Sequence, residues 1–388
     1  MTSPGFPLVW LCGPPGVGKS TVGWELFTTL DRAGIEAGYV DIDQLAMCYP
    51  VAAGDPGRDR MKARNLRALV ANLRSAGARC AVVSGVVEVD MVGAYAEDLD
   101  DVAVTWCRLR VGRDAIVDRL ARRGWSDASV QESLENAESM DRSDFADLCI
   151  DTTGLPVLEV ARLVREQVTW WPSPSVRPAV GGGHAAVTAS SGSSVSAASG
   201  PVLWLCGPTG VGKSSVGWSI FEAVLAAGIA AAFIDLGQIG FSRPAPADDP
   251  DNHRMKAANL AAMWTTYRDA GADCLIVNGP VDRADDVRRY TDALPAATVT
   301  LCRLSAVRDE LTRRILRRGE GGGLELAGDE LVGQPAGLLH RVIESAVTAG
   351  EELERAGIGD LLVDTDGRAA EDVARIVRAE VGDWPLLS

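Results

Sequence analysis

The chain contains a long internal repeat, and this feature limits its possible folds more than any other. Residues 8–27 read LVWLCGPPGVGKSTVGWELF and residues 202–221 read VLWLCGPTGVGKSSVGWSIF, with fourteen of the twenty positions identical at an offset of 194. This period is far longer than the roughly 20–50-residue units of solenoids and propellers. The sequence therefore predicts two whole domains, each long enough to bury a core of its own.

Composition indicates where the two predicted domains meet. Residues 173–199 are rich in Ser, Gly, Ala and Pro and carry one basic residue, Arg177. Such a segment has too few large apolar side chains to build a core, so a flexible linker is expected there. The predicted domains are then residues 1–172 and residues 200–388.

Short apolar runs alternate with segments of helical spacing in the first copy. Residues 8–12 and 79–83 are typical of strands, and residues 19–33 and 60–77 are typical of helices. This alternation predicts an α/β fold in which a parallel sheet carries helices on both faces. Ligands of such sheets bind at the carboxyl ends of the strands.

A glycine-rich loop follows the first predicted strand of each copy. In the first copy it fits the pattern G-x4-G-K-[ST] and opens a helix, where backbone N–H groups can surround phosphate oxygens. The lysine would reach the β- and γ-phosphates and the serine would ligate Mg²⁺, so ATP and Mg²⁺ are the expected cofactors. The predicted nucleotide-binding residues of the two loops are Gly13, Gly16, Val17, Gly18, Lys19, Ser20 and Thr21, and Gly207, Gly210, Val211, Gly212, Lys213, Ser214 and Ser215.

Two carboxylates end the second predicted strand of the first copy. Asp41 and Asp43 are two residues apart and would face the same side of a strand. One can serve the metal, and the other can orient or deprotonate a substrate hydroxyl. The second copy has Asp235 and Gly237 at these positions, so the first copy is predicted to be the catalyst and the second to be degenerate.

Two basic segments are candidate binding elements in an otherwise acidic chain. Residues 113–123 contain four arginines on one predicted helix and its exit, and Arg60 and Lys62 recur in the second copy. If functional, Arg60 and Lys62 would favour an acceptor that carries a carboxylate or a phosphate. The alternatives are a solvated helix face for the arginines, and helix capping with surface ion pairs for Arg60 and Lys62.

In this order and spacing, the motifs of each copy resemble those of the small-molecule P-loop kinases, such as shikimate kinase, gluconate kinase, adenylylsulfate kinase and the antibiotic phosphotransferases. The matching residues are 13–21, 41–43, 83–85, 113–123 and 150–152. The resemblance implies two tandem P-loop NTPase domains, each with a five-stranded parallel sheet of order 2-3-1-4-5. It also implies transfer of the γ-phosphate of ATP to a hydroxyl of a small metabolite or antibiotic.

The resemblance assigns a role to each candidate residue. The implied catalytic residues are Lys19 and Asp43, with Arg122 or Arg123 closing over the phosphates. Arg119, Asp151 and Thr152 would lie near the base, and Asp43, Arg60, Lys62, Ser84 and Gly85 would hold the acceptor. The implied metal ligands are Ser20 and Asp41, with Ser214 and Asp235 in the second copy.

Charge and composition exclude several other classes. The net charge of −15 opposes nucleic-acid binding, and the first 183 residues contain no histidine for a triad or zinc site. No apolar run is long enough to cross a membrane, and the N-terminus does not read as a signal peptide. The cysteines form no CxxC pair and read as core residues of a cytoplasmic protein.

Two alternatives and one further expectation remain open from the sequence. The chain could be a regulatory or scaffold protein that binds nucleotide without acceptor chemistry. It could also be a nucleoside or polynucleotide kinase, although the negative charge of each copy counts against a polynucleotide. Packing of the two domains against each other is possible.

Overall fold

The computed structural model describes residues 5–174, 198–281, 283–322 and 331–385. Most of the predicted linker lies outside these ranges. The chain forms two compact units, each with a mixed α/β fold. Among the described residues, no helix is both long and apolar enough to cross a membrane.

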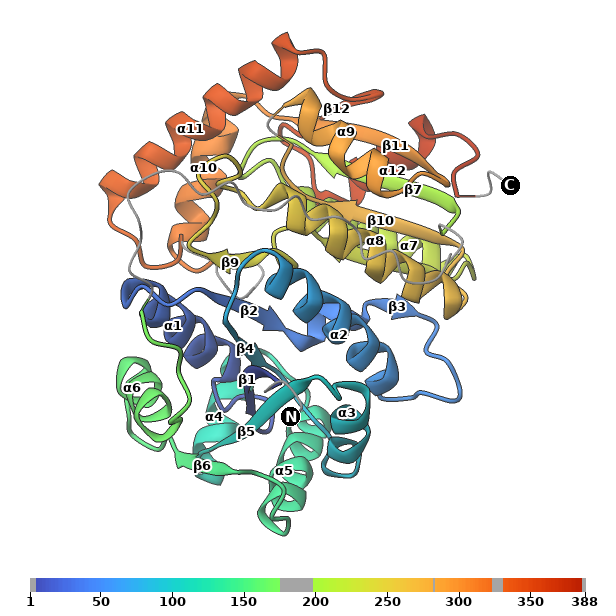
Figure 1. Ribbon diagram of the computed structural model, residues 1–388. Coiled ribbons are helices and arrows are strands. Elements are labelled where there is room, and N and C mark those ends of the chain that lie inside the picture. Colours follow the sequence, from blue (N-terminus) through green and yellow to red (C-terminus); the bar gives the residue numbers. More distant parts are fainter. Residues whose placement is uncertain (1–4, 175–197, 282, 323–330, 386–388) are drawn as a thin grey trace. The chain divides into compact units, whose positions relative to one another are not determined.

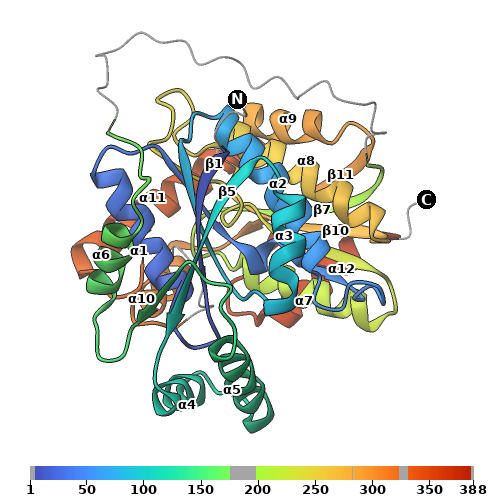
Figure 2. The same ribbon diagram turned by 60° about the horizontal axis from the view of Figure 1, so that its bottom comes forward.

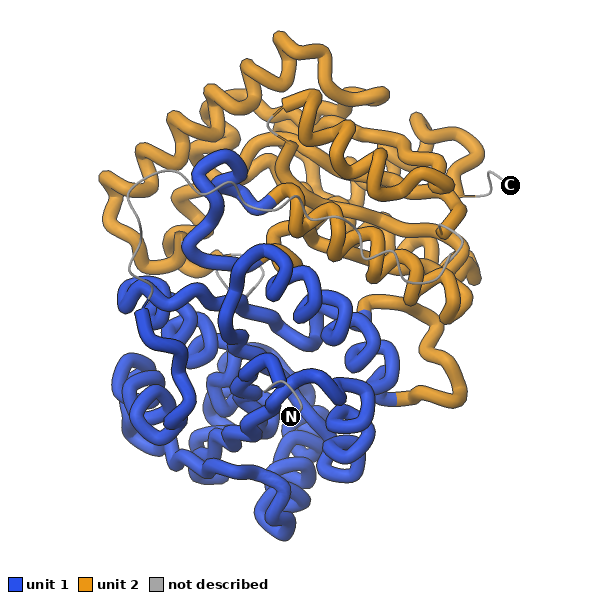
Figure 3. Tube along the Cα trace, in the orientation of Figure 1, with its two compact units in different colours: residues 1–46, 57–188, 241–252 blue, residues 47–56, 189–240, 253–388 orange. Residues whose placement is uncertain are grey.

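The first unit contains residues 1–46, 57–188 and 241–252 (Figure 3). Its elements are β1 (Phe6–Cys12), α1 (Lys19–Arg32), β2 (Ala37–Asp41), the 3-10 helix η1 (Ile42–Ala46), α2 (Asp59–Ser75), β4 (Cys80–Ser84), the 3-10 helix η2 (Val89–Met91), α3 (Val92–Asp98), β5 (Val102–Arg110), α4 (Arg113–Arg122), α5 (Asp127–Asp141), β6 (Leu148–Asp151), α6 (Val157–Gln167) and β9 (Phe241–Arg243).

The second unit contains residues 47–56, 189–240 and 253–388. Its elements are β3 (Cys48–Tyr49), β7 (Gly200–Cys206), α7 (Lys213–Ala226), β8 (Ala231–Asp235), α8 (His253–Asp269), β10 (Cys274–Asn278), α9 (Ala284–Ala293), β11 (Ala297–Ser305), α10 (Arg308–Gly319), α11 (Ala336–Arg355), β12 (Leu361–Asp364) and α12 (Ala370–Glu380).

Each unit is built on a six-stranded sheet. The strand order is β6-β5-β1-β4-β2-β9 in the first unit and β12-β11-β7-β10-β8-β3 in the second. In the first unit, α1 and α6 cover one face of the sheet, and α2 and α3 cover the other (Figures 1 and 2). The pairings are parallel except at one edge of each sheet, where β9 runs antiparallel to β2 and β3 runs antiparallel to β8.

The antiparallel edge strands differ from the prediction of five-stranded parallel sheets. Each unit takes its edge strand from the other sequence repeat: β9 lies in the second repeat, and β3 lies in the first. The units are therefore not the contiguous residue ranges 1–172 and 200–388. Strands of two and three residues carry no periodicity that a sequence reading could detect.

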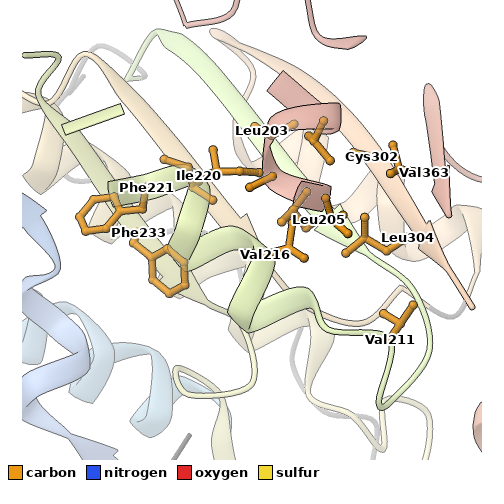
Figure 4. Close-up of a cluster of buried hydrophobic side chains, with 14 of the residues drawn as sticks. Leu203, Leu205, Val211, Val216, Ile220, Phe221, Phe233, Cys302, Leu304 and Val363 are labelled. Atoms are coloured by element: carbon orange, nitrogen blue, oxygen red, sulfur yellow. The ribbon is translucent and has the colours of Figure 1, made fainter. Parts of the chain in front are cut away.

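Apolar side chains between the sheet and the helices form the core of each unit. Figure 4 shows this in the second unit, where Leu203 and Leu205 of β7 lie near Ile220 of α7 and Leu304 of β11. All eight cysteines are free thiols, and seven of them are buried. Burial raises the pKa of Cys12 to about 12, so this thiol behaves as a small apolar side chain.

Candidate functional site

The glycine-rich loop of each unit joins the central strand to the first helix. Gly13, Gly16 and Gly18 all have positive φ, and a Cβ at Gly13 would lie 2.5 Å from the backbone oxygen of Leu109. Only glycine fits this first position of the loop. The loop leads directly into α1, whose first backbone N–H groups have no partner within the helix and can bind an anion.

The P-loop lysines fold back over their own loops. Lys19 is buried, and its Nζ donates to the backbone oxygen of Pro14 at 2.9 Å. In the second unit, the Nζ of Lys213 donates to Gly207 and Pro208 at 2.8 and 2.9 Å. Burial lowers the pKa of Lys19 to about 8, although the charges of Asp43 and Asp41 oppose this shift. At neutral pH the ammonium group therefore remains mostly charged, in a place suited to phosphate.

A serine–aspartate pair lies beside each loop. The Oγ of Ser20 donates to Oδ2 of Asp41 at 3.0 Å, and the Oγ of Ser214 donates to Oδ2 of Asp235 at 2.9 Å. Burial, followed by the charge of Asp43, raises the pKa of Asp41 to about 6. Burial also raises the pKa of Asp235. A hydroxyl and a carboxylate at this spacing fit Mg²⁺, which is commonly held by one or two protein oxygens together with substrate phosphates.

The sequence predicted Asp43 on one strand with Asp41, but β2 ends at Asp41 and Asp43 lies in the first turn of η1, where its side chain is half exposed. The backbone N–H of Asp43 donates to Oδ1 of Asp41 at 3.1 Å. Its own Oδ1 lies 3.8 Å from the Nζ of Lys62, which α2 contributes. A Cβ at Gly85 would lie 3.6 Å from Oδ2 of Asp43. The structure thus brings Asp43, Lys62 and Gly85 together beside the loop.

Two residues expected at the acceptor side lie elsewhere. Arg60 is two residues from Lys62 on α2, and it lines a groove with Arg64, Arg67 and Ala94, whereas Lys62 faces Asp43. Helical geometry separates side chains two positions apart by roughly 200°, which explains the difference. Ser84 is fully buried, and its hydroxyl is 2.8 Å from that of Tyr39.

The buried position of Ser84 differs between the units in a way that affects stability. Its counterpart Asn278 is also fully buried, and neither of its side-chain polar atoms has a hydrogen-bond partner among the described residues. Phe233 replaces Tyr39 here, so the hydroxyl that would supply a partner is missing. A buried polar group without a partner costs about 1–3 kcal/mol.

The double variant Phe233→Tyr/Asn278→Ser should therefore stabilise the protein. It restores the pair found in the first unit, and we expect about 1–2 kcal/mol of added stability. The reciprocal variant Tyr39→Phe should cost about 1 kcal/mol, because it leaves the Ser84 hydroxyl alone. Urea unfolding of the full chain measures both shifts. A double variant with an unchanged midpoint would contradict this account.

The arginines of α4 and of the residue after it differ in exposure and in their contacts with the loop. One guanidinium N–H group of Arg119 donates to the backbone oxygens of Gly16 and Val17 at 3.1 and 3.2 Å. Arg119 therefore stabilises the loop through hydrogen bonds to its backbone oxygens. Arg122 and Arg123 are exposed at the end of the helix. After burial, the positive charge of Arg123 also contributes to lowering the pKa of Lys19.

The remaining candidates lie at the end of β6 and in the first turns of α1 and α7. Thr152 is buried and donates to the backbone oxygen of Arg110 at 3.1 Å, while Asp151 is exposed and accepts from the backbone N–H of Thr153. Hydrogen bonding from the side chain of Thr153, and then from its backbone N–H, lowers the pKa of Asp151. Thr21 and Ser215 are both exposed in the first turns of their helices.

A second carboxylate on the acceptor side was missed in the sequence reading. Glu88 follows the end of β4 by four residues, and both of its side-chain oxygens accept from Asn136 of α5 at 3.3 and 3.4 Å. Burial raises the pKa of Glu88, the charge of Asp59 raises it further, and Lys62 opposes the shift. The position of an acid just past a strand end was the signal that could have identified it.

Comparison with known proteins agrees with the motifs. The family model described as AAA domain matches residues 9–141. A search of curated proteins finds no match to the sequence. The solved structures to which the chain is similar include several small-molecule kinases.

Each of these solved structures aligns with about half of this chain. The Deinococcus radiodurans tunicamycin resistance protein is 22% identical and covers 47% of this chain and 96% of its own, with a TM-score of 0.34. A gluconokinase from Sinorhizobium meliloti 1021 is 16% identical and covers 48% and 94%, with a TM-score of 0.33. The Mycobacterium tuberculosis APS kinase, solved with AMPPNP and APS, is 20% identical and covers 47% and 97%, with a TM-score of 0.30.

Proposed function

We propose that the first unit transfers the γ-phosphoryl group of ATP to a hydroxyl of a small molecule. The observation that carries the proposal is the placement of Asp43. Its half-exposed carboxylate lies beside the glycine-rich loop, in the first turn of η1 and two residues after Asp41, which accepts from Ser20. A protein that only sensed nucleotide would not need this second acid.

Each candidate residue of the first unit has a separate role in an in-line transfer. Lys19 and the N–H groups of the loop would hold the phosphates, and Ser20 and Asp41 would hold Mg²⁺, which neutralises charge on the phosphates when bound. The acceptor oxygen forms a bond to the γ-phosphorus as the bond to the bridging oxygen of ADP breaks. Asp43 would orient the acceptor hydroxyl and take its proton. Arg123 would add positive charge near the transferred group.

The second unit supports nucleotide binding but not the same transfer. Lys213, Ser214 and Asp235 repeat the contacts of the first unit. Gly237 stands in place of Asp43, so no carboxylate arises from that position to receive the proton. We assign catalysis to the first unit and nucleotide binding without transfer to the second.

Two matched lysine variants test this assignment. ADP release from ATP and Mg²⁺ is measured with a panel of hydroxylated acceptors that includes neutral sugars, sugar acids, nucleosides and amino sugars. Lys19→Ala should lower acceptor-dependent turnover by about 100-fold or more, because it removes a charge that stabilises the transferred phosphoryl group. Lys213→Ala should change turnover by less than about tenfold. Loss of turnover in Lys213→Ala with retention in Lys19→Ala would reverse the roles of the two units.

A further inference from the structure

The two units exchange the chain segments that follow β2 and β8. The chain leaves β2 at Asp41, passes through η1 and pairs with β8 as β3. In the other direction, it leaves β8 at Asp235 and pairs with β2 as β9. Each exchanged segment thus begins within a few residues of one serine–aspartate pair and ends on the sheet of the other unit.

Buried hydrogen bonds fix the start of each exchanged segment. The side-chain amide of Asn65 donates to the backbone oxygen of Leu45 at 2.6 Å, and that of Asn259 donates to Ile239 at the same distance. Both asparagines are almost completely buried. In the first unit, Arg58 also donates to the backbone oxygen of Ala46 at 2.9 Å. These segments are therefore held in place and can transmit a displacement.

The strand that arrives in the first unit packs against the helix of the P-loop. The ring of Phe241 lies 4.8 Å from that of Trp24 and 5.7 Å from that of Tyr39, measured between centroids. Nη1 of Arg243 lies 3.9 Å from Oδ2 of Asp31. The Cζ of the same guanidinium lies 5.4 Å from the ring centroid of Trp24. The strand thus contacts the part of α1 between Trp24 and Asp31, and the same helix begins with Lys19 and Ser20.

Tyr39 connects this packing to the phosphate site. Its hydroxyl lies 3.5 Å from the backbone oxygen of Ser20, and it pairs across the strands with Phe241. A displacement of β9 would therefore displace Tyr39, whose hydroxyl contacts the first turn of α1 at Ser20. The origin of β9 is only six residues after Asp235, the acid that faces Ser214 in the second unit.

We propose that the second unit is a regulatory nucleotide site, and that its occupancy changes the nucleotide affinity of the first unit through residues 236–243. This inference rests on the proposed function only in requiring that both loops bind Mg²⁺–nucleotide. Gly237 stands where the acid needed for transfer would be, so nucleotide bound to the second unit is not consumed. Occupancy of that unit can therefore follow the concentration of free nucleotide. By linkage, occupancy of the first unit must alter the affinity of the second by the same factor.

Calorimetric titration of the full chain with ADP and Mg²⁺ tests the coupling without any acceptor. Lys19→Ala reports the second site alone, and Lys213→Ala reports the first site alone. In the unmodified chain, we expect the affinities to differ from these single-site values by about fivefold or more. Equal affinities in the unmodified and single-site chains would overturn the proposal, as would failure of Lys19→Ala to bind nucleotide.

Two further variants test the route. Insertion of Gly-Gly between Gly240 and Phe241 lengthens the segment that joins β8 to β9 and makes it more flexible. Phe241→Ala removes the contact with Trp24 without changing the chain length. Both should retain two binding sites while the coupling factor falls toward one. A matched Gly-Gly insertion after Gly77, in an exposed turn of the first unit, should leave the coupling unchanged. Coupling that survives both route variants contradicts the inference.

Failure here and failure of the proposed function have different signatures. If no acceptor is phosphorylated but the two affinities are coupled, the regulatory inference stands and the transferase assignment does not. If acceptor is phosphorylated and the affinities are independent, the reverse holds.

Discussion

Asp43→Asn is expected to lower acceptor-dependent turnover by roughly 10²–10⁴-fold, the range by which a positioned general base contributes to catalysis. Asparagine keeps the shape of the side chain but cannot accept the proton of the acceptor hydroxyl. The Nζ of Lys62 also loses its anionic partner at 3.8 Å. Binding of ADP and Mg²⁺ should persist within a few-fold, because the hydrogen bond of Asp43 to Asp41 comes from its backbone N–H, which asparagine keeps.

Two companion variants separate this role from others. Asp41→Asn should raise the Mg²⁺ concentration needed for nucleotide binding, because Asp41 accepts from Ser20 at the expected metal position. Asp118→Asn, on the exposed face of α4, is a charge-matched control that should leave turnover unchanged. Turnover of Asp43→Asn within threefold of the unmodified chain would remove Asp43 from the mechanism.

The conformation of the glycine-rich loop and the position of Asp41 could be predicted because each depends on local sequence. Gly13 needs positive φ and the close approach of Leu109, and those demands leave a fixed pattern in the sequence. Asp41 comes at the end of a short buried strand, where parallel strands present their ligands. The loop and the strand-end acids recur in the second repeat, apart from the replacement of Asp43 by Gly237.

Side-chain direction was harder to predict than position in the chain. Ser84 comes at the end of β4, next to the site in sequence, but its hydroxyl faces Tyr39 in the interior. Arg60 comes two residues before Lys62, and a helix turns their side chains apart. Both outcomes depend on how each element rotates against its neighbours, and a one-dimensional pattern does not contain that rotation.

The exchange of edge strands could not be predicted because it depends on a choice between two partner strands of similar sequence. The segments around Tyr49 and Arg243 occupy equivalent places in the two repeats, and each could in principle pair with the sheet of its own repeat. Sequence similarity makes the two pairings alike in side-chain chemistry. The path of the chain through η1 and through residues 236–240 decides between them.

This exchange leads to the second large expected effect: neither repeat should fold as a monomer after separation. A fragment of residues 1–187 retains β2 but lacks β9, and its β3 has lost β8. The unpaired edge of β2 exposes backbone groups that readily pair with another chain. Loss of Phe241 from the rings of Trp24 and Tyr39 adds about 3 kcal/mol or more of destabilisation.

Size-exclusion chromatography with light scattering measures the outcome for residues 1–187, residues 188–388 and the two produced together. Each fragment alone should aggregate or form a dimer, in which two copies exchange the segment that the full chain exchanges between its repeats. Together they should form a complex of one fragment of each kind that binds ADP and Mg²⁺ as the intact chain does. If residues 1–187 form a folded monomer with intact nucleotide binding, β9 is dispensable. Residues 236–243 then cannot carry a signal to Ser20, because β9 would not be needed to hold α1 in place.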